Sequence, residues 1–121
     1  MKSIFFQADK KLLEITKSTV KHPEIANVYF GRKITGEYFV EDNHRDELNE
    51  KFSPLCVDME TASVAQTCYV NNIPFIAVRT VTDTAEHCGS KEFHNNCSKA
   101  SEISANIVRI LLKELCNEYN R

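Results

Sequence analysis

The sequence lacks long apolar runs, a marked excess of one charge and glycine in quantity. No apolar run approaches the roughly 20 residues that a membrane-spanning helix needs, so we expect no membrane partner. Fifteen Lys and Arg against 17 Asp and Glu give a net charge of −2, which offers no electrostatic case for binding nucleic acid. With only three glycines, the chain carries no Walker loop, nucleophile elbow or glycine-rich dinucleotide fingerprint.

The cysteine count also argues against a disulfide framework. The five cysteines are odd in number, and three of them lie in segments that we expect to be strand or helix. Residues 1–11 have too short an apolar core and no small-residue cleavage site, so we do not expect them to be a signal peptide. Reduced thiols and a cytoplasmic location are therefore expected.

What the sequence does contain is typical of an ordinary globular domain, 42% hydrophobic and 26% charged over 121 residues. We expect helices over 9–21, 59–71 and 98–119, strands over 27–34, 55–57 and from Pro74 through 78, one or two helical turns within 41–52, and a polar loop over 84–97. Asp9 is the expected cap of the first helix. Strands that alternate with helices predict an α/β fold, although only three strands are clear.

The segment from Val57 to Ala85 carries the clearest functional signal. Asp58-Met59-Glu60 precedes a helix, and Asp83 follows a β-branched run. Ligands of α/β proteins bind outside the carboxyl ends of parallel strands, so these carboxylates are expected to face one crevice. Such a set suits a reaction in which one carboxylate binds sugar hydroxyls and another protonates a leaving group. Simple capping of a helix or turn is the alternative explanation for each acid.

A second cluster contains the residue types that bind zinc: His87, Cys88, His94 and Cys97. Its spacing does not match that of a zinc knuckle, and the segment is short and polar. We therefore predict no metal site and no cofactor.

The motifs DMETASVAQ and IPFIAVRTVTD closely resemble those of the nucleoside phosphorylase and nucleosidase superfamily, above all the 5′-methylthioadenosine/S-adenosylhomocysteine nucleosidases. FFQADKKLLEIT and GRKITGEYFV resemble further family segments in the same order, so the resemblance covers about Phe5 to Leu115. It implies a partial three-layer α/β/α phosphorylase/hydrolase-like fold with a mixed sheet. Residues 1–121 would form the C-terminal part of a single domain, because the family's glycine-rich N-terminal half, with its nucleophile-binding residues, has no counterpart here.

The resemblance also implies a catalytic role for Asp83. The matching aspartate protonates the purine ring nitrogen nearest the exocyclic amine while the glycosidic bond breaks. Because an adenine anion is a poor leaving group, an acid must neutralise it as the ribose becomes oxocarbenium-like. A carboxylic acid does this near neutral pH only where burial raises its pKa.

Met59 and Glu60 match the residues that bind the ribose. A carboxylate can accept hydrogen bonds from both vicinal hydroxyls, and a methionine supplies an apolar wall beneath the sugar. Asp58 stands where the family usually has glutamate. Being one methylene shorter, it is expected to contact the sugar differently or only through water.

The remaining implied substrate-binding residues lie on two segments. Phe39 matches a phenylalanine that stacks on the purine, and the backbone of Val40 matches one that contacts the base edge. Thr82 matches a small hydroxyl residue near the base, and Arg79 matches an arginine of the hydrolytic branch. An arginine within an apolar strand needs a carboxylate partner, which we expect to lie outside this sequence.

The resemblance therefore predicts a hydrolase that releases adenine from 5′-methylthioadenosine or S-adenosylhomocysteine and is inactive as this segment alone. The expected partners are the nucleoside and either a second copy, as a homodimer, or the missing N-terminal half. A purine nucleoside phosphorylase, which uses phosphate in place of water, and a non-catalytic nucleoside-binding remnant are the alternatives.

Overall fold

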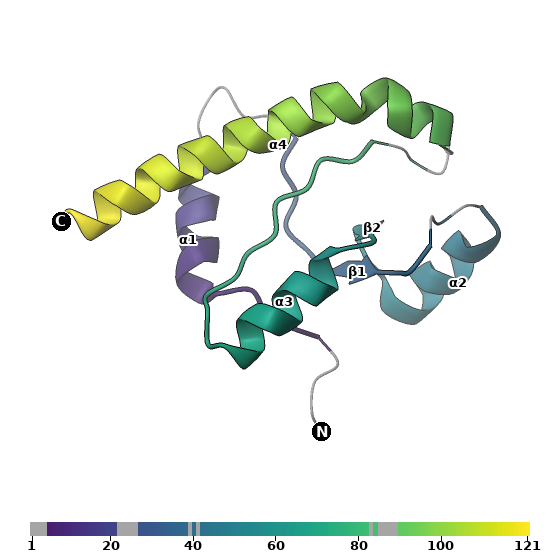
Figure 1. Ribbon diagram of the computed structural model, residues 1–121, viewed down its shortest axis with the longest axis horizontal. Helices are drawn as coiled ribbons and strands as arrows, with labels where there is room; N and C mark the ends of the chain where they lie inside the picture. The colour runs from purple at the N-terminus through teal and green to yellow at the C-terminus, as the bar shows by residue number, and fades with distance from the viewer. Residues whose placement is uncertain (1–4, 22–26, 39, 41, 83, 85–89) are drawn as a thin grey trace.

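The computed structural model describes residues 5–21, 27–38, 40, 42–82, 84 and 90–121 (Figure 1). The elements in chain order are α1 (Lys10–Thr19), β1 (Lys33–Thr35), α2 (Asp42–Phe52), β2 (Cys56–Asp58), α3 (Thr61–Val70) and α4 (Ser90–Tyr119). This alternation confirms the predicted α/β class. Asp9 caps α1 as expected, since its Oδ1 accepts a hydrogen bond from the Leu12 amide at 2.9 Å.

β1 and β2 form a short parallel pair. Lys33 lies opposite Cys56 and Thr35 lies opposite Asp58, and the amide of Gly36 extends the pairing by donating to the Asp58 carbonyl at 2.9 Å. The strand predicted over 27–34 is therefore wrong over 27–32, since β1 begins only at Lys33, and the strand predicted over 55–57 is shifted by one residue. Within the described part of the chain this parallel pair is the whole sheet, so the mixed sheet is not seen there.

The segment over 73–82 is extended but is not a strand, which corrects the third strand prediction. It runs between α3 and α4 (Figure 1). From Ile76 to Thr82 its residues alternate between half-buried and exposed, as in a strand. At its start, the Ile73 amide donates to the Cys68 carbonyl at 2.8 Å, and the Phe75 carbonyl accepts from the Asp9 amide at 2.9 Å. A strand needs a neighbouring backbone, and none is paired with 76–81 among the described residues.

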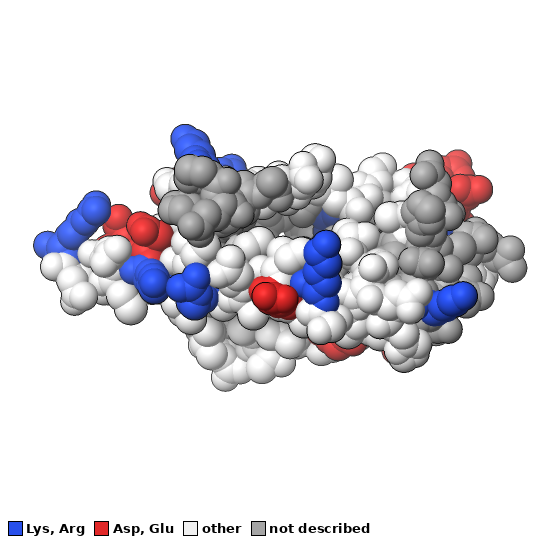
Figure 2. All heavy atoms as spheres, turned by 90° about the horizontal axis from the view of Figure 1, so that it is seen from above, with Lys and Arg blue, Asp and Glu red and all other residues white. Residues whose placement is uncertain are grey.

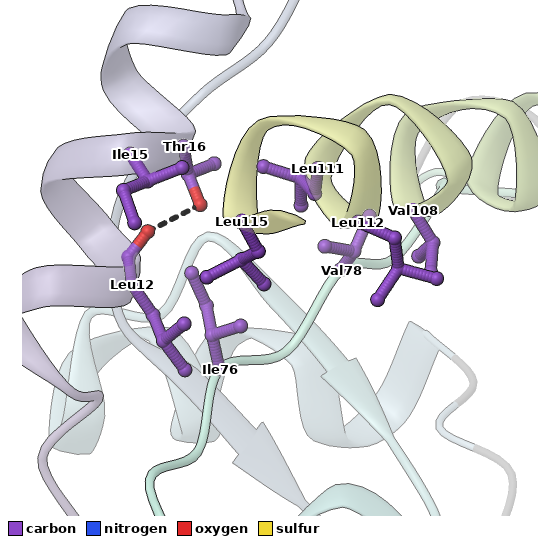
Figure 3. Close-up of a pocket in the computed structure, with 9 residues that line it drawn as sticks. All are labelled: Leu12, Ile15, Thr16, Ile76, Val78, Val108, Leu111, Leu112 and Leu115. Carbon is purple, nitrogen blue, oxygen red and sulfur yellow. Dashed lines mark hydrogen bonds between the residues drawn. The ribbon is translucent and has the colours of Figure 1, made fainter. Parts of the chain in front are cut away.

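The main apolar core lies between α1 and α4. Leu12 and Thr16 of α1, Ile76 of the extended segment, and Leu111 and Leu115 of α4 point toward one another around a gap of about 210 Å³ (Figure 3). Leu111 and Thr16 are buried. The Thr16 hydroxyl donates to the Leu12 carbonyl at 2.7 Å, so its burial leaves no unmade hydrogen bond.

Two helices, α4 and α2, are longer than expected. α4 begins at Ser90 and runs for 30 residues, so the predicted loop over 84–97 is wrong in its second half. The polar residues Lys91 and His94 to Asn96 are exposed, which shows that polarity there marks a solvent-facing helix surface. α2 has 11 residues in place of one or two turns. In the described part of the chain, no helix is both long and apolar enough to cross a membrane.

Candidate functional site

The carboxylate of Asp58, at the end of β2, accepts four hydrogen bonds and forms an ion pair with Arg79, although its side chain is only 12% exposed. Its Oδ1 accepts from the Thr35 hydroxyl at 2.8 Å and from the Thr61 amide at 3.2 Å. Its Oδ2 contacts the Lys33 ammonium, the Thr61 hydroxyl and, at 2.8 Å, Nη2 of Arg79. We call these five residues the Asp58 cluster. A carboxylate offers about four lone-pair positions, so Asp58 has none to spare.

The local sequence explains why these groups meet. Alternate residues of a strand face the same side, which places Lys33 and Thr35 together on β1. The parallel register then sets Thr35 opposite Asp58. Three residues later α3 begins, and its N-cap residue, Glu60, makes no side-chain cap bond. Asp58 takes over that role by accepting from the Thr61 amide.

Arg79 connects the buried carboxylate to an exposed one. Its Nη2 lies 2.8 Å from Oδ2 of Asp58, 3.1 Å from Oε2 of Glu60 and 3.4 Å from the Thr61 hydroxyl. The Arg79 side chain is 45% exposed and that of Glu60 is 65% exposed. The expected carboxylate partners of Arg79 are therefore present, but in this chain, which corrects the expectation that they lie outside it.

Burial and pairing act on the charges of this cluster in opposite directions. Burial alone would raise the pKa of Asp58, but hydrogen bonds from Lys33, Thr61 and Thr35 outweigh it and hold the pKa of that carboxyl well below its usual range. Burial lowers the pKa of the Lys33 ammonium, and the nearby Asp58 opposes this shift. Burial also raises the pKa of the Cys56 thiol. Asp58 is therefore a fixed negative charge near neutral pH.

The structure describes three of the other predicted site residues: Met59, Thr82 and Val40. Met59 lies between Asp58 and Glu60 in the sequence and is 45% exposed, so its side chain is available to a ligand. The carbonyl of Thr82 accepts a hydrogen bond from Asn96 of α4 at 2.9 Å, which fixes the end of the extended segment. Val40 is half-buried. Phe39 and Asp83 lie outside the described residues.

Sequence reasoning missed three members of the Asp58 cluster: Lys33, Thr35 and Thr61. The signal for the first two was their spacing, because residues two apart on a strand share a face, and a lysine on a short strand beside a carboxylate is a candidate ion pair. Thr61 is a first-turn residue whose hydroxyl and amide both donate to Asp58.

Other parts of the molecule offer less for a ligand. The gap in Figure 3 is lined by apolar side chains and Thr16, without a titratable group, so it belongs to the core. Figure 2 shows basic and acidic side chains interspersed over one face, between uncharged surface. Among the described residues, no three His, Cys, Asp or Glu side chains are grouped as metal ligands would be. His87 and Cys88 of the zinc hypothesis lie outside those residues.

The cluster joins a parallel strand end, a helix start and a bridging arginine, as expected for a ligand site of an α/β protein. The sequence model of the phosphorylase superfamily matches residues 3–113. The chain therefore belongs to this superfamily, as its motifs predicted.

Within this superfamily, the chain is similar to nucleosidases. The chain is 35% identical to the 5′-methylthioadenosine/S-adenosylhomocysteine nucleosidase of Bacillus cytotoxicus and 33% identical to that of an Exiguobacterium species. Each match covers 91% of this chain and 48% of the relative. The chain thus spans about half the length of these curated relatives.

Solved structures support the same grouping. The S-adenosylhomocysteine nucleosidase of Streptococcus pyogenes, in complex with 5-methylthiotubericidin, superposes with a TM-score of 0.87 at 33% identity, covering 94% of this chain and 49% of that one. The futalosine hydrolase of Helicobacter pylori superposes with a TM-score of 0.85 at 26% identity, covering 93% and 48%. The α/β phosphorylase-like fold is therefore shared.

Proposed function

We propose that this chain supplies the purine- and ribose-binding part of a nucleosidase. The reaction is hydrolysis of the N-glycosidic bond of 5′-methylthioadenosine or S-adenosylhomocysteine, with water as the nucleophile and adenine as a product. The observation that carries the proposal is the Arg79 bridge from half-buried Asp58 to exposed Glu60 at the start of α3. Similarity to nucleosidases in sequence and in structure supports it.

In this proposal Glu60 binds the ribose. Its carboxylate is exposed and paired with Arg79, so it is held in place and open to the two vicinal hydroxyls. Met59 forms the apolar wall beside the sugar. Asp58 does not contact the sugar directly, because its carboxylate oxygens are already bound by the other residues of the cluster. Its role is to hold Arg79 and the first turn of α3 in position.

The base is bound by three residues and protonated by a fourth. Phe39 stacks on the purine, the Val40 backbone contacts the base edge, and Thr82 lies near the base. Asp83 is the general acid that protonates the departing adenine. The bond between Asn96 and the Thr82 carbonyl supports this placement, because it ties the residue next to Asp83 to a long, rigid helix.

We propose that residues 1–121 are the C-terminal part of one domain with three α/β/α layers and a mixed sheet, in which further strands pair with the open edges of 76–81. The partner is an N-terminal half or a second copy in a homodimer. Sedimentation of this chain alone should show self-association, and a monodisperse monomer would count against it.

The free thiols of Cys56, Cys68, Cys97 and Cys116 support a cytoplasmic location.

The second candidate function is phosphorolysis, which the superfamily match favours. Against it, both cations of the cluster are paired: Lys33 contacts Asp58, and Arg79 contacts Asp58 and Glu60. A neutralised cluster attracts phosphate weakly. A non-catalytic nucleoside-binding protein is the third candidate, and the likeness to futalosine hydrolase makes futalosine a second substrate to test.

Adenine release separates these functions. The chain should be incubated with 5′-methylthioadenosine with and without phosphate, and then with futalosine. Release without phosphate supports the nucleosidase, and release only with phosphate supports the phosphorylase. Binding of the nucleoside without release supports either the non-catalytic function or an incomplete site, which adding an N-terminal half would distinguish.

A further inference from the structure

Lys33 is a half-buried cation that the proposed chemistry does not use. Its side chain is 14% exposed, and its ammonium contacts the Asp58 carboxylate and, at 2.5 Å, the Thr61 hydroxyl. Lysine is rarely buried unless it is paired, because removing an ammonium from water is costly. Its position on β1 therefore calls for an explanation beyond packing.

The contacts of the cluster form a chain of shared partners. Asp58 is shared by Lys33 and Arg79, and Arg79 is shared by Asp58 and Glu60. Two cations thus balance two carboxylates. Without Lys33, one guanidinium would have to balance both carboxylates. The guanidinium would then pair mainly with Asp58, because an unpaired charge costs more free energy at the less exposed Asp58 than at the exposed Glu60.

We propose that Lys33 is a positioning residue: by neutralising Asp58 from the β1 side, it leaves the Arg79 guanidinium able to hold Glu60 at the mouth of the site. Lys33 itself touches no substrate. What Glu60 then binds rests on the proposed function, but the effect of Lys33 on Asp58 and Arg79 does not.

The ionisable groups around Asp58 make this effect measurable. Lys33 faces it from β1, Arg79 from the extended segment and Glu60 from the start of α3, while Cys56 lies on the same strand. Burial keeps the Cys56 thiol neutral in acid, and Arg79 stays charged. Among the groups that lower the pKa of Asp58, Lys33 is the one that carries a charge, and the others are the hydroxyls of Thr61 and Thr35 and the Thr61 amide. The acid titration of Asp58 therefore reports on the charge of Lys33.

The first experiment follows the side-chain carboxyl carbons of Asp58 and Glu60 by NMR from pH 7 downward. In the unchanged chain, Asp58 should titrate below its ordinary pKa of about 3.9. Lys33→Met keeps the length of the side chain and removes its charge, and should raise the Asp58 midpoint by about one pH unit, a tenfold change in proton affinity. Lys33→Arg should preserve the low midpoint. The matched control is Lys113→Met on the exposed surface of α4, which should change nothing.

The second experiment measures binding of 5′-methylthioadenosine and of free adenine by calorimetry. Lys33→Met should weaken nucleoside binding about tenfold and leave adenine binding nearly unchanged, because only the ribose depends on Glu60. Equal weakening of both ligands, or an unchanged Asp58 midpoint, would overturn the proposal. If the unchanged chain binds no nucleoside, the proposed function fails, and the carboxyl titration still decides the role of Lys33.

Loss of folding would also be informative. If Lys33→Met does not fold, the double variant Lys33→Met/Asp58→Asn should, because removing both charges leaves no unpaired buried carboxylate. A double variant that also fails to fold would assign Lys33 to packing and overturn the positioning role.

Discussion

The region where α1 packs on α4 and the Asp58 cluster are stabilised by different forces. Around Leu111 the contacts are between apolar side chains, and the buried hydroxyl of Thr16 is satisfied within its own helix. Around Asp58 nearly every contact is a hydrogen bond or an ion pair across three segments. Burial of apolar side chains stabilises a fold without requiring a precise geometry. A buried ion pair adds little net stability, but an arrangement that leaves one of its charges unpaired is strongly unfavourable.

This difference suggests a division of roles. The α1–α4 core holds the extended segment from one side, through Ile76 and through the hydroxyl pair of Thr80 and Ser104 at 2.6 Å. The cluster holds the same segment from the other side, through Arg79. Changes in the core should therefore affect stability at every pH, and changes in the cluster should affect ligand binding and acid stability.

The largest effect should come from Asp83→Asn, which tests the proposed general acid. In an assay in which the unchanged chain, alone or with an N-terminal half, releases adenine, this substitution should reduce the rate by about 10²-fold or more, since general acid catalysis typically contributes 10²–10⁴. Circular dichroism should stay unchanged. A variant with full activity would remove Asp83 from the mechanism.

Leu111→Ala tests the apolar region. Leu111 is 7% exposed, and truncating such a residue costs about 2–5 kcal/mol. Urea unfolding should show this loss equally at pH 4 and pH 7, with no change in the ratio of nucleoside to adenine affinity. Leu112→Ala is the matched control, because Leu112 is 56% exposed and its loss should cost less. A pH-dependent loss in Leu111→Ala would break the division of roles.

The acid stability of the chain tests the polar region. Because the pKa of Asp58 is lowered in the folded chain, its contribution to stability is present above its unfolded pKa of about 3.9 and is lost as pH falls below that value. The unfolding free energy should therefore decrease with acid below about pH 4. The slope should be smaller in Asp58→Asn, and an identical slope in the two proteins would contradict the assigned pairing.

The smallest effect should come from Gly31→Ala, at the edge of the sheet. A Cβ at Gly31 would lie 2.4 Å from Cδ1 and 2.7 Å from Cγ of Leu55, which is too close. Leu55 is 58% exposed and can rotate away, so we expect a cost of about 1 kcal/mol. In the double variant Gly31→Ala/Leu55→Ala the cost of the glycine change should disappear. A cost that persists there would place the strain in the backbone.

Much of the fold could be predicted from local sequence. The Asp9 cap, the three long helices and the short strand before Asp58 follow from spacing and capping residues. The start of α4 could not be predicted, because exposed polar residues suit a helix and a loop equally well. The state of 73–82 depends on which strands lie beside it, and an apolar β-branched run does not contain that information.

The superfamily motifs predicted part of the site. Asp58 and Glu60 were expected at one crevice, but their contact with Arg79 was not, because the carboxylate partner of Arg79 was expected to lie outside this sequence. Lys33 was not expected, because its role depends on a pairing between β1 and β2 that brings residues 25 positions apart into contact. Such non-local contacts follow from the register of the sheet and are not visible in a local motif.

The most direct test of the account is the affinity of the chain for 5′-methylthioadenosine and for adenine before and after Glu60→Gln. The substitution preserves shape and removes the charge that Arg79 orients. We expect nucleoside binding to weaken about tenfold or more, with adenine binding within a factor of about two, because a charged acceptor is worth about 1.5–3 kcal/mol. Equal affinities of the two proteins for the nucleoside would contradict the assignment of Glu60 and the Asp58 cluster to ribose binding.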